Sequence, residues 1–214
     1  MVSFGHAAFF GLGGYITGIL AFHFNNYEPI QILVFEFEGT NQLLLIWIFT
    51  LIFSSILALF IGYFSLRTTG VYFIMITLAF AQMLYYFSIS WPTYGGEDGL
   101  SLSLRNQIPF LNTMDPTTFF YICYVWLIIK IILVKFILNS PLGISLKASK
   151  ENDDRVRSVG INPKKVKLIS FIISGAITGL AGSLYADLNR FVSPTILSWQ
   201  MSGEIMILVI LGGM

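Results

Sequence analysis

Few side chains in this 214-residue chain could take part in chemistry, and most of them lie in one stretch. Residues 139–167 hold seven of the twelve Lys and Arg residues and three acids, in a segment too short to form its own core. Such a segment is typical of a surface that binds a partner protein, although a solvated basic loop would have the same composition. The basic residues are Lys147, Lys150, Arg155, Arg157, Lys164, Lys165 and Lys167.

Three polar residues stand inside otherwise apolar sequence. Glu204 could belong to a transport pathway or hydrogen-bond a neighbouring helix, because a carboxylate in such surroundings needs a polar or aqueous environment. For His6 and Gln82 a structural hydrogen bond is the favoured interpretation. A proton relay would need such groups close together.

Motifs for catalysis are missing from the sequence. It contains no G-x-x-x-x-G-K-[ST], H-E-x-x-H or G-x-S-x-G. The single Cys123 excludes an internal disulfide and a cysteine-rich metal site. We therefore predict no catalytic residues, no metal site and no cofactor bound by this chain.

The composition places the chain in a membrane. Hydrophobic residues make up 56% of it, charged residues 11%, and the mean hydropathy is +0.78. The net charge of +1 gives no reason to expect nucleic acid. An integral membrane protein is predicted.

The elements that must position the polar groups are apolar segments of helical length. About 20 apolar residues cross the hydrocarbon layer as a helix, and the runs lack the alternation of a membrane barrel. We predict an all-α, polytopic bundle with about six membrane segments. They are residues 6–24, 43–65, 71–90, 118–138, 166–186 and 201–214.

The basic residues predict the orientation of the chain. If it starts inside and crosses at each segment, nine basic residues are cytoplasmic and only Arg105 and Arg190 are external, with Lys130 left inside the fourth segment. Lys130 is expected to extend toward the cytoplasmic interface.

Within the charged stretch, a helix over 145–158 and a stop at Gly160 to Pro163 are predicted. Helical spacing gives this helix one face for a partner, formed by Leu146, Ser149, Asp153, Val156 and Gly160. The spacings Gly14-x-x-x-Gly18 and Gly175-x-x-x-Gly179 predict close helix packing.

Four blocks of sequence, in order, resemble the permease subunits of branched-chain amino-acid ABC importers. They are SFGHAAFFGLGGY (3–15), RTTGVYFIMITLAFAQMLYYF with TYGGEDGL (67–87 and 93–100), KENDDRVRSVGINPKKVKLISFIISGAITGLAGSLYA (150–186) and FVSPTILSWQMSGEIMILVILGGM (191–214). The resemblance covers nearly the whole chain. Arg155 and Val156 depart from the small residues that often follow the acidic pair in this family.

The resemblance implies a single transmembrane permease domain over 1–214, truncated at both ends, in the cell inner membrane. It also implies a cytoplasmic coupling loop over 139–165, with Gly160 at the family's glycine position. The implied partners are a sister permease, two ATP-binding cassette subunits that use ATP, and an external substrate-binding protein. A urea or amide importer permease and an ion-coupled carrier using Glu204 and His6 remain alternatives. The residues expected to couple to the ATPase are Lys147, Ser149, Glu151, Asn152, Asp153, Arg155, Gly160 and Asn162.

Overall fold

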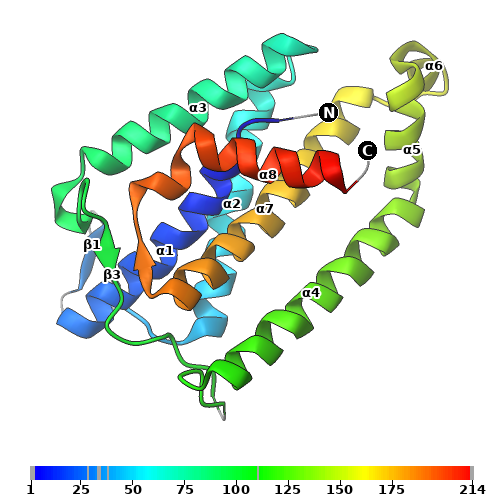
Figure 1. The fold of residues 1–214 in the computed structure, drawn as a ribbon. Coiled ribbons are helices and arrows are strands. Elements are labelled where there is room, and N and C mark those ends of the chain that lie inside the picture. The colour runs from blue at the N-terminus through cyan, green and yellow to red at the C-terminus, as the bar shows by residue number, and fades with distance from the viewer. Residues whose placement is uncertain (1–2, 28, 33–34, 38, 110, 213–214) are drawn as a thin grey trace.

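The computed structural model describes residues 3–27, 29–32, 35–37, 39–109 and 111–212. Five helices in this part of the chain are long and apolar enough to cross a membrane (Figure 1). The predicted all-α, multi-pass fold is therefore confirmed. The five helices are α1 (His6–Asn26), α2 (Leu43–Ser65), α3 (Val71–Ile89), α4 (Pro116–Asn139) and α7 (Pro163–Asn189).

Helices α1 and α7 form the centre of the bundle and approach each other at glycines. A Cβ on Gly13 would overlap the carbonyl oxygen of Gly179, and a Cβ on Gly182 would overlap that of Phe10. No hydrophobic force drives helices together inside a lipid bilayer. Close backbone packing therefore supplies much of the free energy of helix association.

Helix α2 packs against another side of α7. A Cβ on Gly175 would lie 2.7 Å from the Cβ of Ala58, so this glycine also serves close packing. Near the same level, the ring of Phe171 meets Phe9 edge-on at 5.5 Å and Phe73 at 6.0 Å. This aromatic cluster joins α1, α3 and α7.

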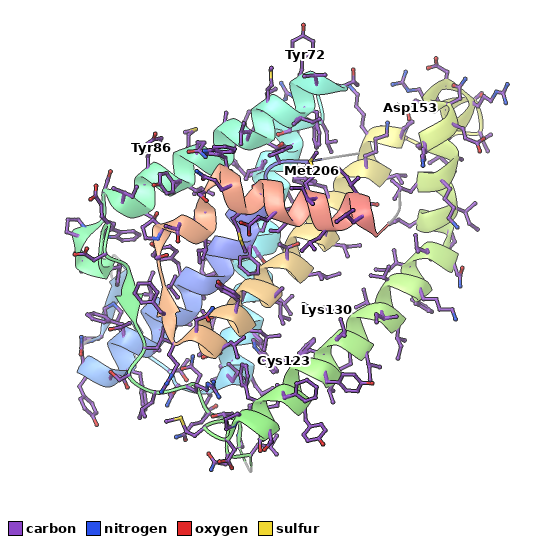
Figure 2. All side chains as sticks on the ribbon, viewed as in Figure 1. Tyr72, Tyr86, Cys123, Lys130, Asp153 and Met206 are labelled. Carbon is purple, nitrogen blue, oxygen red and sulfur yellow. The ribbon has the colours of Figure 1, made fainter. Side chains whose placement is uncertain are left out.

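Helices α3 and α4 lie on opposite sides of this centre (Figure 1). Helix α4 packs mainly through its N-terminal half, where the ring of Trp126 meets Trp47 at 4.8 Å. Cys123 and Lys130 lie on the side of α4 that faces the bundle (Figure 2). Lys130 Nζ donates to the carbonyl oxygen of Ile177 at 3.4 Å, so the expectation that it extends to the cytoplasmic interface is wrong.

The end of the bundle opposite the charged stretch carries short extended segments. They form two antiparallel pairs. Strand β1 (Ile30–Ile32) pairs with β2 (Phe35–Phe37), and β3 (Leu100–Ser101) pairs with β4 (Phe191–Val192). The 3₁₀ turn η1 (Pro92–Tyr94) lies at the same end.

After α7 the chain turns back along α1 without forming a helix at once. Strand β4 and the 3₁₀ turn η2 (Pro194–Leu197) run back along α1. Three glycines of α1 leave room for the side chains of this segment. Gly14 and Gly18 therefore accommodate mainly this returning segment, although a Cβ on Gly18 would also meet Leu100 of β3 and one on Gly14 would lie 3.6 Å from the carbonyl oxygen of Gly182. The facing pairs are Gly18 with Val192, Gly14 with Ile196 and Gly11 with Leu197.

The last described helix, α8 (Trp199–Leu211), starts where η2 ends, and contacts α1 and α3. Its 13 residues give a length of about 20 Å, which is short of the ~30 Å hydrocarbon layer. In Figure 1, α8 runs across the bundle at a steep angle to α7. The predicted sixth segment is thus a shorter apolar helix within the described residues, and residues 213–214 of that prediction lie outside them.

The two groups of basic residues lie at opposite ends of the bundle. Arg67 at the α2–α3 turn shares a cavity with Arg157 and Lys164. Arg105 instead donates to the carbonyl oxygen of Leu188 at 3.4 Å, near Arg190. This grouping agrees with a chain that crosses at each long helix.

Candidate functional site

Residues 139–165, called the coupling segment below, form two short helices between α4 and α7. They are α5 (Pro141–Glu151) and α6 (Asp153–Ser158). The single helix predicted over 145–158 is broken at Asn152, whose Oδ1 accepts hydrogen bonds from the backbone N–H groups of Asp154 (2.8 Å) and Arg155 (3.2 Å). Asn152 therefore caps α6, as asparagine does at helix starts.

The predicted stop after the second helix is confirmed. Gly160 has a φ of +86°, a left-handed conformation that favours glycine, and a Cβ there would meet no other atom. Asn162 then caps α7 by accepting from the N–H of Lys164 at 3.1 Å. Caps on both sides fix where the coupling segment turns.

Most of the face expected to meet a partner is turned inward, so that prediction is wrong for Ser149, Asp153 and Val156, whereas Gly160 is exposed. Ser149 and Val156 are 6% and 5% exposed, respectively. Asp153 forms an ion pair with Lys167 of α7, with Lys167 Nζ lying 2.6 and 2.8 Å from the two carboxylate oxygens. Periodicity located the apolar face of the segment correctly but assigned it to a partner instead of to α7.

The remaining candidate residues of the coupling segment are exposed. Their side chains and the open backbone at Gly160 form a surface of mixed charge on the outside of α5 and α6. Residues on this exposed surface are Lys147, Glu151, Asn152, Arg155, Gly160 and Asn162.

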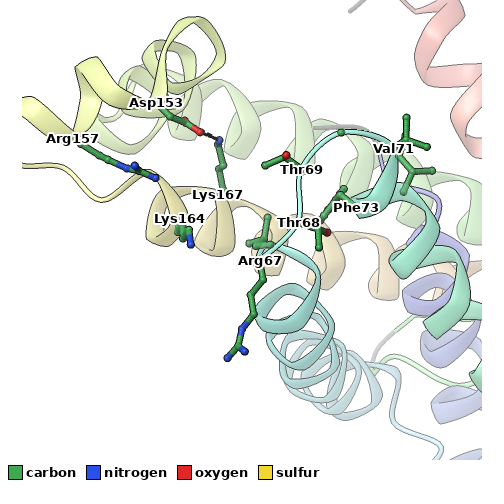
Figure 3. A pocket seen from close by; sticks show the side chains of 12 residues that line it. Arg67, Thr68, Thr69, Val71, Phe73, Asp153, Arg157, Lys164 and Lys167 are labelled. Atoms are coloured by element: carbon green, nitrogen blue, oxygen red, sulfur yellow. Dashed lines mark hydrogen bonds and ion pairs between the residues drawn. The ribbon is translucent and has the colours of Figure 1, made fainter.

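Two cavities separate the coupling segment from the rest of the bundle. One, of ≈ 440 Å³, lies between α6, the start of α7 and the α2–α3 turn (Figure 3). The other, of ≈ 500 Å³, lies between α5, α7 and the start of α1. Lys167 and Phe73 line both cavities. The Asp153–Lys167 ion pair therefore joins α6 to α7 beside these cavities.

Arg67 does not take part in that connection, although it lines the first cavity. Its Nη2 donates to the hydroxyl of Tyr63 at 2.9 Å, and its guanidinium lies 4.8 Å from the centre of the Tyr63 ring. Figure 3 shows the guanidinium pointing away from the Asp153–Lys167 pair.

The three polar residues singled out within apolar sequence are not brought together. His6 Nε2 and Ser174 Oγ are 3.0 Å apart, in a bond between α1 and α7 near the coupling segment. The Nε2 atom of Gln82 is buried on α3, and among the described residues it has no hydrogen-bond partner. Glu204 lies on α8, in a separate cavity with Tyr85. The structure therefore assembles no relay of His6 and Glu204.

One buried polar cluster escaped the sequence analysis. Asp187, fully buried near the end of α7, accepts a hydrogen bond from Asn106 Nδ2 at 2.8 Å. Arg105 Nη1 donates to the carbonyl oxygen of Thr113 at 3.3 Å in the same loop. This cluster holds the external loop on α7. An acid at a predicted helix end gives no sign of burial, because exposed acids are common there.

The fold and the charged segment define a multi-pass membrane protein that carries a mixed-charge surface at one end of its described part. The chain belongs to the family described as "Branched-chain amino acid transport system / permease component", whose sequence profile matches residues 1–214. No solved structure matches the chain.

Individual relatives agree with this assignment. The high-affinity branched-chain amino acid transport system permease protein LivM of Escherichia coli (strain K12) is 30% identical over 124 residues, or 58% of this chain and 27% of that protein. The probable branched-chain amino acid transport permease protein LivH of Methanocaldococcus jannaschii is 35% identical over 72 residues, 34% of this chain and 23% of that protein. A tyrosine transport system permease protein of Clostridioides difficile (strain R20291) is 35% identical over 60 residues, 28% of this chain and 20% of that protein. The matched part of the chain thus spans about a quarter of the length of these relatives.

Proposed function

We propose that this chain forms part of the membrane-spanning permease of an ATP-driven importer of branched-chain amino acids. The observation that carries the proposal is the family match over residues 1–214. Its partners are a sister permease, two ATP-binding cassette subunits and an external substrate-binding protein. ATP is bound and hydrolysed by the partner subunits, and the permease moves the substrate by alternating access.

The coupling segment is the surface where an ATP-binding subunit docks. Lys147, Glu151 and Arg155 offer both charge signs on its exposed face, which suits charge-paired docking. A push on α6 reaches α7 through Asp153 and Lys167. Because α7 packs backbone to backbone on α1, the push continues into the centre of the bundle.

The alternatives have less support. An ion-coupled carrier would use His6 and Glu204 together, whereas His6 bonds Ser174 and Glu204 lies in another cavity. A urea or amide importer is not favoured, because the relatives are named for amino acids. The amino acids in these names have different side chains. The feature that they share is the α-amino-acid group.

The variant Gly160→Ala tests the docking role. Alanine fits the open space at Gly160 but holds a positive φ poorly, at a cost of about 1–2 kcal/mol. We expect the turn after α6 to shift and substrate-stimulated ATP hydrolysis by the assembled transporter to fall about five- to thirtyfold, the factors that 1–2 kcal/mol represent.

Gly96→Ala is the matched control. Gly96 also has a positive φ, of +47°, and an added Cβ would come no closer than 3.4 Å to other atoms, but it lies at the opposite end of the bundle. Gly96→Ala should leave coupling unchanged. Normal coupling in Gly160→Ala, with both variants inserted equally well, would return the segment to the solvated-loop interpretation.

A further inference from the structure

A cavity of ≈ 390 Å³ lies between α3, α7, η2 and α8, away from the coupling segment. Glu204 is exposed to it, and among the described residues its carboxylate has no hydrogen bond or ion pair. The residues that line the cavity are Tyr85, Tyr185, Thr195, Ile196, Ser198, Gln200, Met201 and Glu204.

Glu204 belongs to an apolar helix, so this face of α8 does not suit lipid. A charged carboxylate in the hydrocarbon centre costs on the order of 2.5–3.5 kcal/mol on insertion scales, and such groups face a bundle interior or a water-filled cavity. The break in regular α-helix at β4 and η2, between α7 and α8, supports the same conclusion. Irregular backbone at membrane depth is tolerated where it is buried in protein or lines a water-filled cavity.

We propose that this cavity binds the α-ammonium group of a transported amino acid, with the Glu204 carboxylate as its counter-ion. The inference rests on the proposed function, since it names how that substrate is held within the membrane. A free carboxylate at membrane depth is a ready partner for a cation. The rings of Tyr85 and Tyr185 add aromatic surface, which attracts an ammonium group.

The apolar side chain of the substrate has a surface in the same cavity. Ile196 and Met201 line it beside the polar residues. This combination of one charged anchor and unspecific apolar walls suits amino acids that differ in side chain. The volume also lies within the range of pockets that bind small molecules, roughly 300–1,000 Å³.

The test uses the complete transporter in liposomes, with Thr195→Cys as a reporter in a Cys123→Ser background. Thr195 lines the cavity and is exposed. Its reaction is measured with a cationic and an anionic thiol reagent, with and without leucine. We expect the cationic reagent to react about thirtyfold faster than the anionic one, since an ionised carboxylate about 4 Å away attracts the first and repels the second by about 1 kcal/mol each in water. Leucine should slow the reaction.

Glu204→Gln should abolish both the charge preference and the protection by leucine, and Glu204→Asp should keep them. Glu97→Gln, an exposed acid in the loop after α3, should change neither. If leucine is imported with ATP but gives no protection, or if Glu204→Gln keeps both effects, the inference is wrong while the proposed function stands. A wild-type transporter that imports no amino acid with ATP would overturn both.

Discussion

At the scale of single residues, Gly13 sets how closely the two central helices approach. A Cβ at this position would overlap the backbone of α7, and neither backbone can move without disturbing the packing of α2. Gly203 on α8 is the contrasting case, because a Cβ there would meet nothing within 4 Å.

We predict that Gly13→Ala lowers the stability of the protein in detergent by about 1–3 kcal/mol, the usual cost of overpacking. Gly203→Ala should be neutral or slightly stabilising, since alanine favours helices more than glycine does. Thermal unfolding of both purified variants measures the difference. Equal melting temperatures would show that α1 and α7 do not meet at Gly13.

The sequence predicts residue roles well where a residue type has few uses. Gly160 as a helix stop is such a case, because a positive φ strongly favours glycine. It predicts them poorly where one type serves several uses. Ser149 and Asp153 looked like partner-binding residues, yet Ser149 is buried and Asp153 is held by Lys167. Helical periodicity defines a face but does not say what covers it.

At the scale of elements, the five long helices could be predicted almost to their ends. The segment predicted over 118–138 is Pro116–Asn139, and that over 166–186 is Pro163–Asn189. Hydrocarbon thickness imposes the length of a spanning helix, so a long apolar run is a strong signal.

The returning segment of β4 and η2 could not be predicted. Its path depends on the room left by Gly11, Gly14 and Gly18 on α1. Gly14 and Gly18 were interpreted as a helix-packing motif. A non-local backbone contact of this kind leaves no period in the sequence.

Helix α6 has only six residues and forms one ion pair with α7 among the described residues. We predict that Asp153→Asn or Lys167→Met speeds hydrogen exchange of the α6 amides, and that the reversed pair Asp153→Lys with Lys167→Asp restores protection. The pair is partly exposed, at 37% for Asp153 and 22% for Lys167, so its contribution is about 1 kcal/mol or less and the exchange rate changes up to about fivefold.

The control for this prediction is Asp154→Asn. The Asp154–Arg157 pair is much more exposed, with the Asp154 side chain 87% exposed, and should contribute little. If Asp154→Asn speeds exchange as much as Asp153→Asn does, the Asp153–Lys167 pair has no special role in holding α6.

At the scale of the whole molecule, the basic residues predict which end of the bundle faces the cytoplasm. Single cysteines replacing Val159 and Asn112, in a Cys123→Ser background, should react with an impermeant thiol reagent from opposite sides of the membrane. Both positions are exposed, whereas Ser149 is too buried to report. Labelling of both cysteines from one side would contradict the alternate-crossing topology.

If the coupling segment contacts an ATP-binding subunit, photo-cross-linking in the assembled transporter will detect that contact. A photoreactive amino acid at exposed Arg155 should form an adduct with the ATP-binding subunit, identified by mass spectrometry. The same amino acid at Asn112, at the opposite end, should not. The absence of this adduct at position 155, in a transporter whose uptake runs on a proton gradient without ATP, would contradict the account.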